Sequence, residues 1–293
     1  MRPAVRPEVR LEWFAKGGVV VWADPDVVPR AAVGELFALP MVLDPLRGTA
    51  SRAAALRTLW RWSPQWLAAR RTVGRLVVRQ YAHGGLWGRL LGRHAALFCT
   101  SRPMLRELQV ALHARQQGVP TARPVALRIQ KKFGLLLTAQ YVTEEIPEAR
   151  DLLELSHLVQ TGASCPAPAR QAIARAVAAA LAALHAAGIR HGDLNLKNLL
   201  VSERHSPPRA YVIDFKKARL QREVSLQEGL AGLVRLDRSV LKWSASRNLI
   251  TVADRLRVLR EYVRLRAATA DWKGWARTIR TRHLLHAVTR QRS

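Results

Sequence analysis

The sequence of 293 residues is poor in cysteine, in acidic side chains and in long apolar runs. Its two cysteines, Cys99 and Cys165, lie far apart and lack the spacing of metal ligands, which argues against a disulfide framework or a structural zinc site. The first ten residues are basic and no apolar segment follows them, so no secretory signal peptide is visible. The most apolar stretch, residues 176–187, is too short to span a bilayer, and we expect a protein that does not cross the membrane.

The shortage of acids leaves a large positive charge. Lysine and arginine number 48 against 21 aspartates and glutamates, which gives a formal net charge of +27. Such a balance indicates anionic partners: nucleic acid, an acidic membrane surface, or phosphorylated or carboxylated substrates. A coding bias toward arginine is an alternative for part of the charge, although it does not explain the shortage of acids. Hydrophobic residues make up 49% of the chain, enough to bury a sizeable core.

The residues that carry chemistry cluster between His191 and Phe215. An aspartate and an asparagine stand five residues apart at Asp193 and Asn198, and a second aspartate, Asp214, follows a short apolar run. This spacing is typical of phosphotransferases of the protein-kinase type. Each residue alone fits a turn equally well, but the three together favour the catalytic interpretation.

Each of these side chains has a distinct predicted role. Asp193 is the candidate that orients the acceptor hydroxyl and receives its proton. Asn198 and Asp214 are the candidate Mg²⁺ ligands, because magnesium prefers oxygen donors and completes its shell with water and phosphate oxygens. His191 is expected to brace the loop rather than to react.

Two residues after Asp193 stands Asn195, where many kinases place a lysine that contacts phosphate. An amide adds no charge there. Lys197, Lys216 and Lys217 lie close in sequence and could supply the charge, with solvated surface lysines as the alternative. Of the three, Lys197 is the candidate for nucleotide binding.

In the amino-terminal half, Arg79 stands on an apolar strand where kinases carry a lysine for the α- and β-phosphates of ATP. Glu107, on the following helix, is its expected ion-pair partner, with a surface salt bridge as the alternative. Arginine can bind phosphate bidentately, so it can take the place of the kinase lysine, although the two side chains are not equivalent. The phosphate-covering loop is weakly indicated, because the segment around Gly48 has a single glycine.

The order of predicted elements indicates an α+β fold of two lobes, like that of protein kinases. A small, mainly antiparallel sheet lobe with one helix precedes a larger helical lobe. We expect an irregular, proline-broken extension over residues 1–45, the sheet lobe over 46–142, and the helical lobe with a basic tail over 143–293. The expected strands cover 19–22, 54–60, 66–71, 76–81, 125–129, 134–142, 199–201 and 211–213, and the expected helices 102–117 and 170–187.

At these residues the chain resembles the bacterial lipopolysaccharide core kinases, and it is most similar to the 3-deoxy-D-manno-octulosonic acid (Kdo) kinases. The resemblance covers roughly residues 45–245. It implies phosphorylation by ATP and Mg²⁺ of a Kdo hydroxyl on Kdo-lipid A, at the cytoplasmic face of the bacterial inner membrane, with Asp193 as the catalytic aspartate. The blocks that carry it are Leu76 to Leu86, Arg102 to Ala126, His191 to Asn198, Ile213 to Phe215 and Arg235 to Lys242.

The tail over 249–288 places apolar residues on one helical face with arginines around it, and Trp272 and Trp275 follow. Such a helix suits an anionic membrane surface, although a helix packed on the carboxy-terminal lobe is also compatible. Other functions stay open: a heptose kinase, a kinase of proteins or small molecules, and a basic nucleic-acid-binding pseudokinase. The complete set of Asp193, Asn198 and Asp214 argues against the pseudokinase, and so against nucleic acid as the partner.

Overall fold

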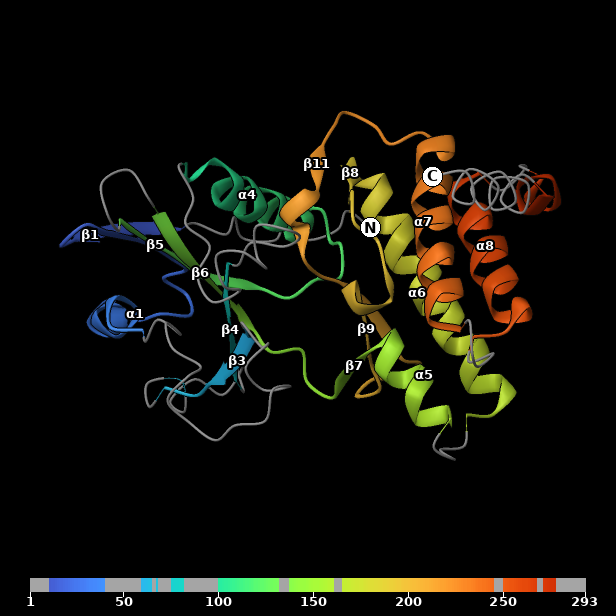
Figure 1. Cartoon of the computed structure of the whole chain (residues 1–293), viewed down its shortest axis with the longest axis horizontal. Coiled ribbons are helices and arrows are strands. Elements are labelled where there is room, and N and C mark those ends of the chain that lie inside the picture. The colour runs from blue at the N-terminus through green and yellow to red at the C-terminus, as the bar shows by residue number, and fades with distance from the viewer. Residues whose placement is uncertain are drawn as a thin grey trace, which may run out of the picture. The chain divides into compact units, whose positions relative to one another are not determined.

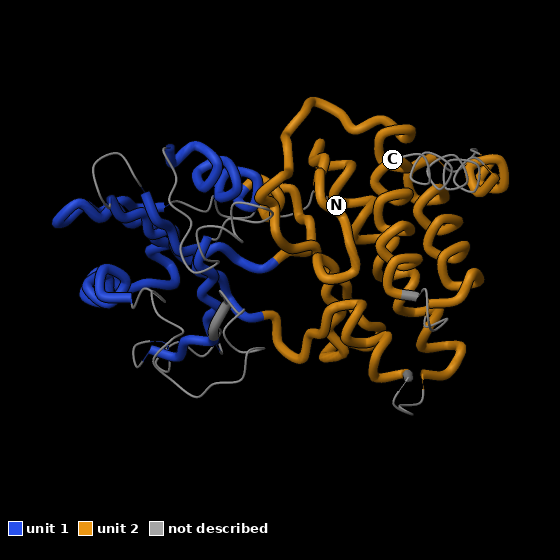
Figure 2. Tube along the Cα trace, viewed as in Figure 1, with its two compact units in different colours: residues 1–112, 122–145 blue, residues 113–121, 146–293 orange. Residues whose placement is uncertain are grey.

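The computed structural model describes residues 11–39, 59–64, 67, 75–81, 100–131, 137–160, 165–244, 250–267 and 271–277. The chain divides into two compact units, coloured separately in Figure 2. Unit 1 comprises Met1–Leu112 and Ala122–Glu145, and unit 2 comprises His113–Thr121 and Ile146–Ser293. The division between Glu145 and Ile146 falls shortly after the lobe boundary expected at residue 142.

The segment His113–Thr121 groups with unit 2 through two contacts at its ends. His113 Nε2 lies 2.9 Å from the carbonyl oxygen of Ala187, and the amide of Val212 donates to the carbonyl oxygen of Pro120 at 2.9 Å. These two hydrogen bonds tie the segment to Ala187 and Val212 of its own unit.

Unit 1 is built on a six-stranded antiparallel sheet (Figure 1). Its spatial order is β1-β2-β5-β6-β4-β3. Helices α1 and α4 and the 3-10 helix η1 also belong to this unit. The bounds are β1 Glu12–Lys16, β2 Val19–Ala23, η1 Arg30–Ala32, α1 Val33–Phe37, β3 Leu59–Trp62, β4 Leu76–Gln80, α4 Arg102–Gln116, β5 Pro124–Lys131 and β6 Leu137–Glu144.

The strand expected over 19–22 is confirmed as β2. The prediction that residues 1–45 otherwise form an irregular extension is wrong for the described part, because β1 and α1 are also regular and belong to the sheet unit. Gly17 and Gly18 adopt positive φ and make the tight turn between β1 and β2. Strand β2 then pairs with β5 along its whole length. Pro25 and Pro29, the prolines in the described part of this stretch, lie after β2 and do not interrupt a strand.

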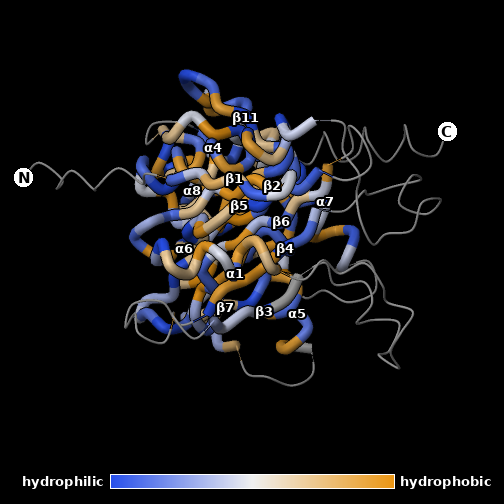
Figure 3. Tube along the Cα trace, turned by 90° about the vertical axis from the view of Figure 1, so that its left-hand side faces the viewer, coloured by the Kyte–Doolittle hydropathy of each residue, from blue (hydrophilic) through white to orange (hydrophobic). Residues whose placement is uncertain are grey.

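Apolar side chains from β2, α1, β4, β5 and β6 make one core in unit 1. Val21, Leu36, Val78 and Val125 are fully buried there, and the strand β5 is buried along most of its length. Figure 3 colours the chain trace by hydropathy, with apolar residues in orange. Strands β1 and β2 extend the sheet beyond β5, and α1 contributes Val33 and Leu36 to the core, so these elements belong to the sheet unit.

Several predicted elements of unit 1 differ from the structure. Leu67, the described residue of the strand expected over 66–71, is helical, so that prediction is wrong there. The strands expected over 54–60 and 134–142 are found as β3 and β6, with residues 54–58 and 134–136 outside the described part. The weakly indicated phosphate loop around Gly48 also lies outside it.

Unit 2 is mainly helical and carries two small antiparallel sheets, of order β10-β9-β7 and β11-β8. The candidate catalytic motif lies between β8 and β9, and Asp214 follows β10. The bounds are β7 Ala149–Asp151, α5 Leu152–Gln160, α6 Ala167–Ala186, β8 Ile189–Arg190, η2 Leu196–Asn198, β9 Leu199–Ser202, β10 Arg209–Val212, η3 Phe215–Lys217, β11 Arg219–Leu220, α7 Leu226–Ser244 and α8 Val252–Arg266.

Helix α6 packs against α8 and also contacts β8, β9 and β10 (Figure 1). His185 of α6 and Tyr262 of α8 are both buried, and Nδ1 of the histidine lies 2.7 Å from the tyrosine Oη. Burial lowers the pKa of His185 to about 4, so its ring is neutral at pH 7. Its Nδ1 can then accept a hydrogen bond from the tyrosine hydroxyl. A Cβ at Gly229 would lie 1.9 Å from that Oη, so only glycine lets α7 approach the pair this closely.

The predicted α+β fold with a sheet lobe and a helical lobe is confirmed. The sheet lobe contains the short helix α1 in addition to the one expected helix. In the described ranges, no helix combines the length and hydropathy that a membrane span needs.

Candidate active site

The loop after β8 is held against the segment that follows Asp214. Gly192 adopts φ +75°, and a Cβ there would lie 2.3 Å from the carbonyl oxygen of Lys217. The guanidinium of Arg235, on α7, donates to the carbonyl oxygen of Gly192. Only glycine permits the left-handed turn and the close backbone approach together. Gly192 therefore fixes the position of the backbone that carries the Asp193 side chain.

The backbone of Asp193 is held while its carboxylate is left accessible. The Asp193 carbonyl oxygen accepts hydrogen bonds from Asn195 Nδ2 at 3.0 Å and from Asn198 Nδ2 at 2.9 Å. The carboxylate pairs with Lys217, whose Nζ lies 3.0 Å from Asp193 Oδ2, and the aspartate side chain is 43% exposed. An open carboxylate on a rigid loop is what the orientation of an incoming hydroxyl requires.

The two predicted magnesium ligands come together in the structure. The amide of Ile213 donates to the carbonyl oxygen of Asn198 at 3.0 Å, which sets Asp214 next to the asparagine. Because Asn198 Nδ2 is used on the Asp193 carbonyl, its Oδ1 is left as an oxygen donor. Asp214 adopts φ 64°, ψ 72°, a left-handed conformation in which few residues other than glycine, asparagine and aspartate are found.

His191 braces this loop, as the sequence indicates. Its ring is buried, its Nε2 lies 3.0 Å from the Ile213 carbonyl oxygen, and its Nδ1 lies 3.4 Å from the amide of Asp193. Burial lowers the pKa of His191, so the neutral ring can donate through Nε2 and accept through Nδ1. One side chain thus ties the segment before Asp214 to the segment that carries Asp193.

The second predicted constellation lies in unit 1, and the expected ion pair between Arg79 and Glu107 is confirmed there. Glu107 is 1% exposed and also accepts a hydrogen bond from Tyr81 Oη. The Arg79 guanidinium lies 5.1 Å from the centre of the Tyr81 ring and 5.6 Å from that of Tyr141. Burial and then the charge of Glu107 raise the pKa of Tyr81, so its hydroxyl stays protonated as a donor.

The sequence analysis does not identify Tyr81 as a partner of Glu107. A signal existed: side chains two apart on a strand share a face, so Tyr81 had to lie on the face of Arg79.

Replacement of Arg79 by methionine is expected to destabilise unit 1 by about 3 kcal/mol, because it leaves the buried Glu107 carboxylate without its cation. The measurement is the free energy of unfolding in urea. Arg106→Met, at the exposed neighbour of Glu107 on α4, is the matched control and should cost little. Equal losses for the two variants would show that Arg79 and Glu107 do not form a functional pair.

The side chain of Lys197 is turned toward α7. Its ammonium stands over the ring of Trp243, on α7, with Nζ 5.2 Å from the ring centre. The lysine that reaches Asp193 is Lys217. The nucleotide-binding role of Lys197 stays a prediction, and its cation–π contact explains why its side chain turns toward α7.

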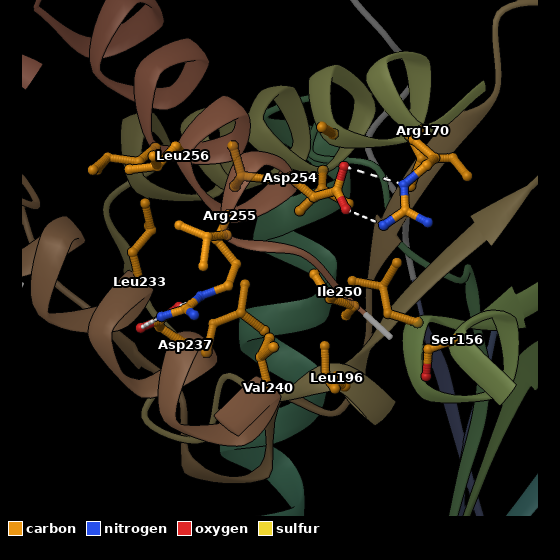
Figure 4. Close-up of a pocket in the computed structure, with 18 of the residues that line it drawn as sticks. Ser156, Arg170, Leu196, Leu233, Asp237, Val240, Ile250, Asp254, Arg255 and Leu256 are labelled. Carbon is orange, nitrogen blue, oxygen red and sulfur yellow. Dashed lines mark hydrogen bonds and ion pairs between the residues drawn. The ribbon is translucent and has the colours of Figure 1, made fainter. Parts of the chain in front are cut away.

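An apolar cavity of about 860 Å³ in unit 2 borders the catalytic loop (Figure 4). Leu196, from the catalytic loop, shares its wall with aliphatic side chains of α5, α6, α7 and α8. Two ion pairs stand in this wall, Arg170 with Asp254 and Arg255 with Asp237. Because the charges in the wall are paired with each other, the cavity presents chiefly hydrocarbon.

The arginine-rich helix α8 packs on unit 2, which is the alternative left open for the first half of the tail. Its residues Leu259, Tyr262 and Val263 are buried. Most of its arginines are engaged inside the unit: Arg255 with Asp237, Arg257 with Asp254, Arg264 with Glu261, and Arg266 with the carbonyl oxygen of Val224.

Comparison with known proteins bears on this geometry. The family model of the lipopolysaccharide kinase (Kdo/WaaP) family matches residues 65–262, about two thirds of the sequence. The chain belongs to this family. Membership of the lipopolysaccharide kinase family makes it a phosphotransferase that acts on a hydroxyl group.

Curated relatives in the lipopolysaccharide kinase family are 3-deoxy-D-manno-octulosonic acid kinases. That of Vibrio cholerae serotype O1 is 31% identical over 176 residues, 59% of this chain and 68% of that protein. That of Haemophilus influenzae strain 86-028NP is 34% identical over 145 residues, 48% of this chain and 56% of that protein. The chain therefore spans between about half and two thirds of the length of these relatives.

Among solved structures, a WaaP chain in complex with acyl carrier protein is similar, with a TM-score of 0.48 and 23% identity. The match covers 71% of this chain and 78% of that one.

Proposed function

We propose that this protein transfers the γ-phosphoryl group of ATP to a hydroxyl group of Kdo in Kdo-lipid A. The observation that carries the proposal is the convergence of Asp193, Asn198 and Asp214 in one hydrogen-bonded loop system, within a chain of the lipopolysaccharide kinase family. ATP use follows from the family. The identity of the acceptor rests on the curated relatives, which are Kdo kinases.

In the proposed reaction the acceptor oxygen attacks the γ-phosphorus, the bond from that phosphorus to the β–γ bridging oxygen breaks, and ADP leaves. The proton of the acceptor hydroxyl goes to the carboxylate of Asp193. The chain's own contribution is to hold that carboxylate accessible on a loop fixed by His191 and Gly192. Positioning of this kind supplies much of the rate enhancement in phosphoryl transfer.

Asn198 Oδ1 and the Asp214 carboxylate fit a Mg²⁺ site. Both offer oxygen ligands, and they come from two segments that the hydrogen bond from Ile213 to Asn198 joins. Within the residues described, no group of three or more His, Cys, Asp or Glu side chains could hold a metal by itself. A site with two protein ligands leaves the remaining positions for phosphate oxygens, which suits a nucleotide-bound cation. When bound, the cation neutralises charge on the phosphates.

Arg79 is the proposed contact for the α- and β-phosphates. Glu107 holds the guanidinium from one side, and the two tyrosine rings limit its movement. The Arg79 side chain is still 20% exposed, so part of its guanidinium group can reach a ligand. An oriented arginine can bind phosphate oxygens bidentately.

The positive charge and the apolar cavity support an anionic, lipid-linked acceptor. Kdo carries a carboxylate and lipid A carries phosphates, which matches a net charge of +27. The cavity beside Leu196 offers hydrocarbon surface close to the catalytic loop. A polar sugar acceptor without acyl chains would have no use for such a surface.

We further propose that the enzyme works at the cytoplasmic face of the bacterial inner membrane as a peripheral protein. Large apolar side chains stand exposed on α7 and α8 among basic residues, an arrangement that favours contact with anionic lipid headgroups. These side chains are Leu241, Trp243, Val252, Leu256 and Leu265.

The test is to incubate the purified full chain with Mg-ATP and, in parallel, with Kdo-lipid A, a heptose-bearing core acceptor and a generic protein acceptor. Mass spectrometry then locates any added phosphate. We expect phosphate on Kdo in the first reaction only. Phosphate found only on heptose, or only on protein, would refute the Kdo assignment in favour of the corresponding alternative.

A further inference from the structure

Lys217 stands in an unusual place for a residue that follows the metal-binding segment. Its ammonium lies 3.0 Å from Asp193 Oδ2, yet the lysine side chain is 65% exposed. Its backbone carbonyl is packed against Gly192, so the backbone of Lys217 is held in place while its exposed ammonium group can change orientation. The ammonium can therefore touch the candidate catalytic carboxylate and a ligand beside it at the same time.

Asn195 cannot supply the missing charge at the usual position. It is neutral, and both ends of its amide are already occupied: Oδ1 accepts from the amide of Lys197 at 3.0 Å, and Nδ2 donates to the Asp193 carbonyl oxygen at 3.0 Å. The asparagine caps η2 and shapes the loop. Lys197, the nearest other cation in the loop, is turned toward Trp243.

We propose that Lys217 takes the place of the absent lysine and holds the γ-phosphate of ATP beside Asp193. The inference rests on the proposed kinase function and names a further residue of that site. Before the nucleotide binds, the ammonium neutralises the Asp193 carboxylate. With the nucleotide bound, it bridges that carboxylate and the γ-phosphate oxygens, and so sets the phosphorus near the group that receives the acceptor proton.

An ammonium in this place makes a charge-assisted hydrogen bond that ATP can form and ADP cannot. We therefore expect Lys217→Met to weaken binding of Mg-ATP by about tenfold and to leave binding of Mg-ADP unchanged. It should also lower kcat for transfer, because charge develops on the γ-phosphoryl group in the transition state. Titration calorimetry with Mg-ATP and Mg-ADP gives the first result and needs no acceptor.

The matched control is Arg219→Met, which removes one positive charge from an exposed residue two positions further along the chain. It should leave the ratio of ATP to ADP affinity unchanged.

The outcomes separate the alternatives. An equal loss of ATP and ADP affinity, or no loss of either, overturns the proposal. A raised KM for the acceptor with ATP binding intact also overturns it, since Lys217 would then bind the acceptor carboxylate. Transfer to the wrong acceptor by the unaltered protein contradicts the proposed function alone, because the two nucleotide affinities still test Lys217. Since the ion pair with Asp193 is exposed, its removal should not change the thermal midpoint of unfolding.

Discussion

Asp193→Asn is expected to lower kcat for transfer to the Kdo acceptor by about 10²–10⁴-fold. The substitution keeps the shape of the side chain and removes the charge that receives the acceptor proton. The fold should survive, because Asn195 and Asn198 bind the carbonyl oxygen of residue 193 and not its side chain. The affinity for Mg-ATP should change far less than kcat, because the carboxylate contributes to the transition state rather than to nucleotide binding.

The measurement is a steady-state assay at saturating Mg-ATP, with circular dichroism to show that the variant is folded. Glu203→Gln, at an exposed carboxylate in the turn before β10, is the matched control and should keep full activity. A folded Asp193→Asn protein with more than a tenth of the unaltered kcat would refute the catalytic assignment.

The catalytic loop could be read from the sequence because its information is local. Asp193, Asn198 and the surrounding turn lie within a few residues of one another, and the apolar run before Asp214 marks a strand that returns to them. The pair of Arg79 and Glu107 could be predicted because kinases carry a cation on a strand and its acidic partner on the helix that follows. In both cases a known spacing replaces knowledge of the tertiary structure.

The remaining features depend on contacts between distant segments. Nothing in the spacing shows that Lys217 rather than Lys197 would reach Asp193, since the choice is made by Trp243 on α7 and by the close packing at Gly192. Arg235 likewise reaches the loop from a helix far along the chain. Such contacts become visible only when the helices are placed.

The error over the amino-terminal residues has a different origin. Prolines on both sides of this stretch indicate breaks in the chain, but they leave room for the strand expected over 19–22. Strand β2 pairs with the buried strand β5, and β1 in turn pairs with β2, so the place of β1 in the sheet depends on pairing that propensity alone does not show. Propensity is a weak guide where burial of a whole strand is at stake.

Asp214→Asn is expected to raise the Mg²⁺ concentration needed for half-maximal activity by about 100-fold and to lower kcat at any fixed Mg²⁺. Asparagine keeps one oxygen donor but lacks the negative charge that attracts the cation. Asparagine is the informative replacement here, because residue 214 adopts a left-handed conformation that asparagine tolerates. An alanine at this position would add backbone strain of about 1–2 kcal/mol and confuse loss of metal with loss of structure.

The experiment is a titration of activity with MgCl₂ at fixed ATP, for the unaltered protein and for Asp214→Asn. The matched control is Asp26→Asn, at an exposed aspartate of unit 1. Excess Mg²⁺ should recover part of the activity of Asp214→Asn, since the asparagine oxygen and Asn198 remain. It should not recover Asp193→Asn, because that variant lacks a proton acceptor and not a metal ligand. Equal rescue of both variants by Mg²⁺ would mean that the two aspartates do not divide the work in this way, and would remove the basis for assigning one to the proton and the other to the cation.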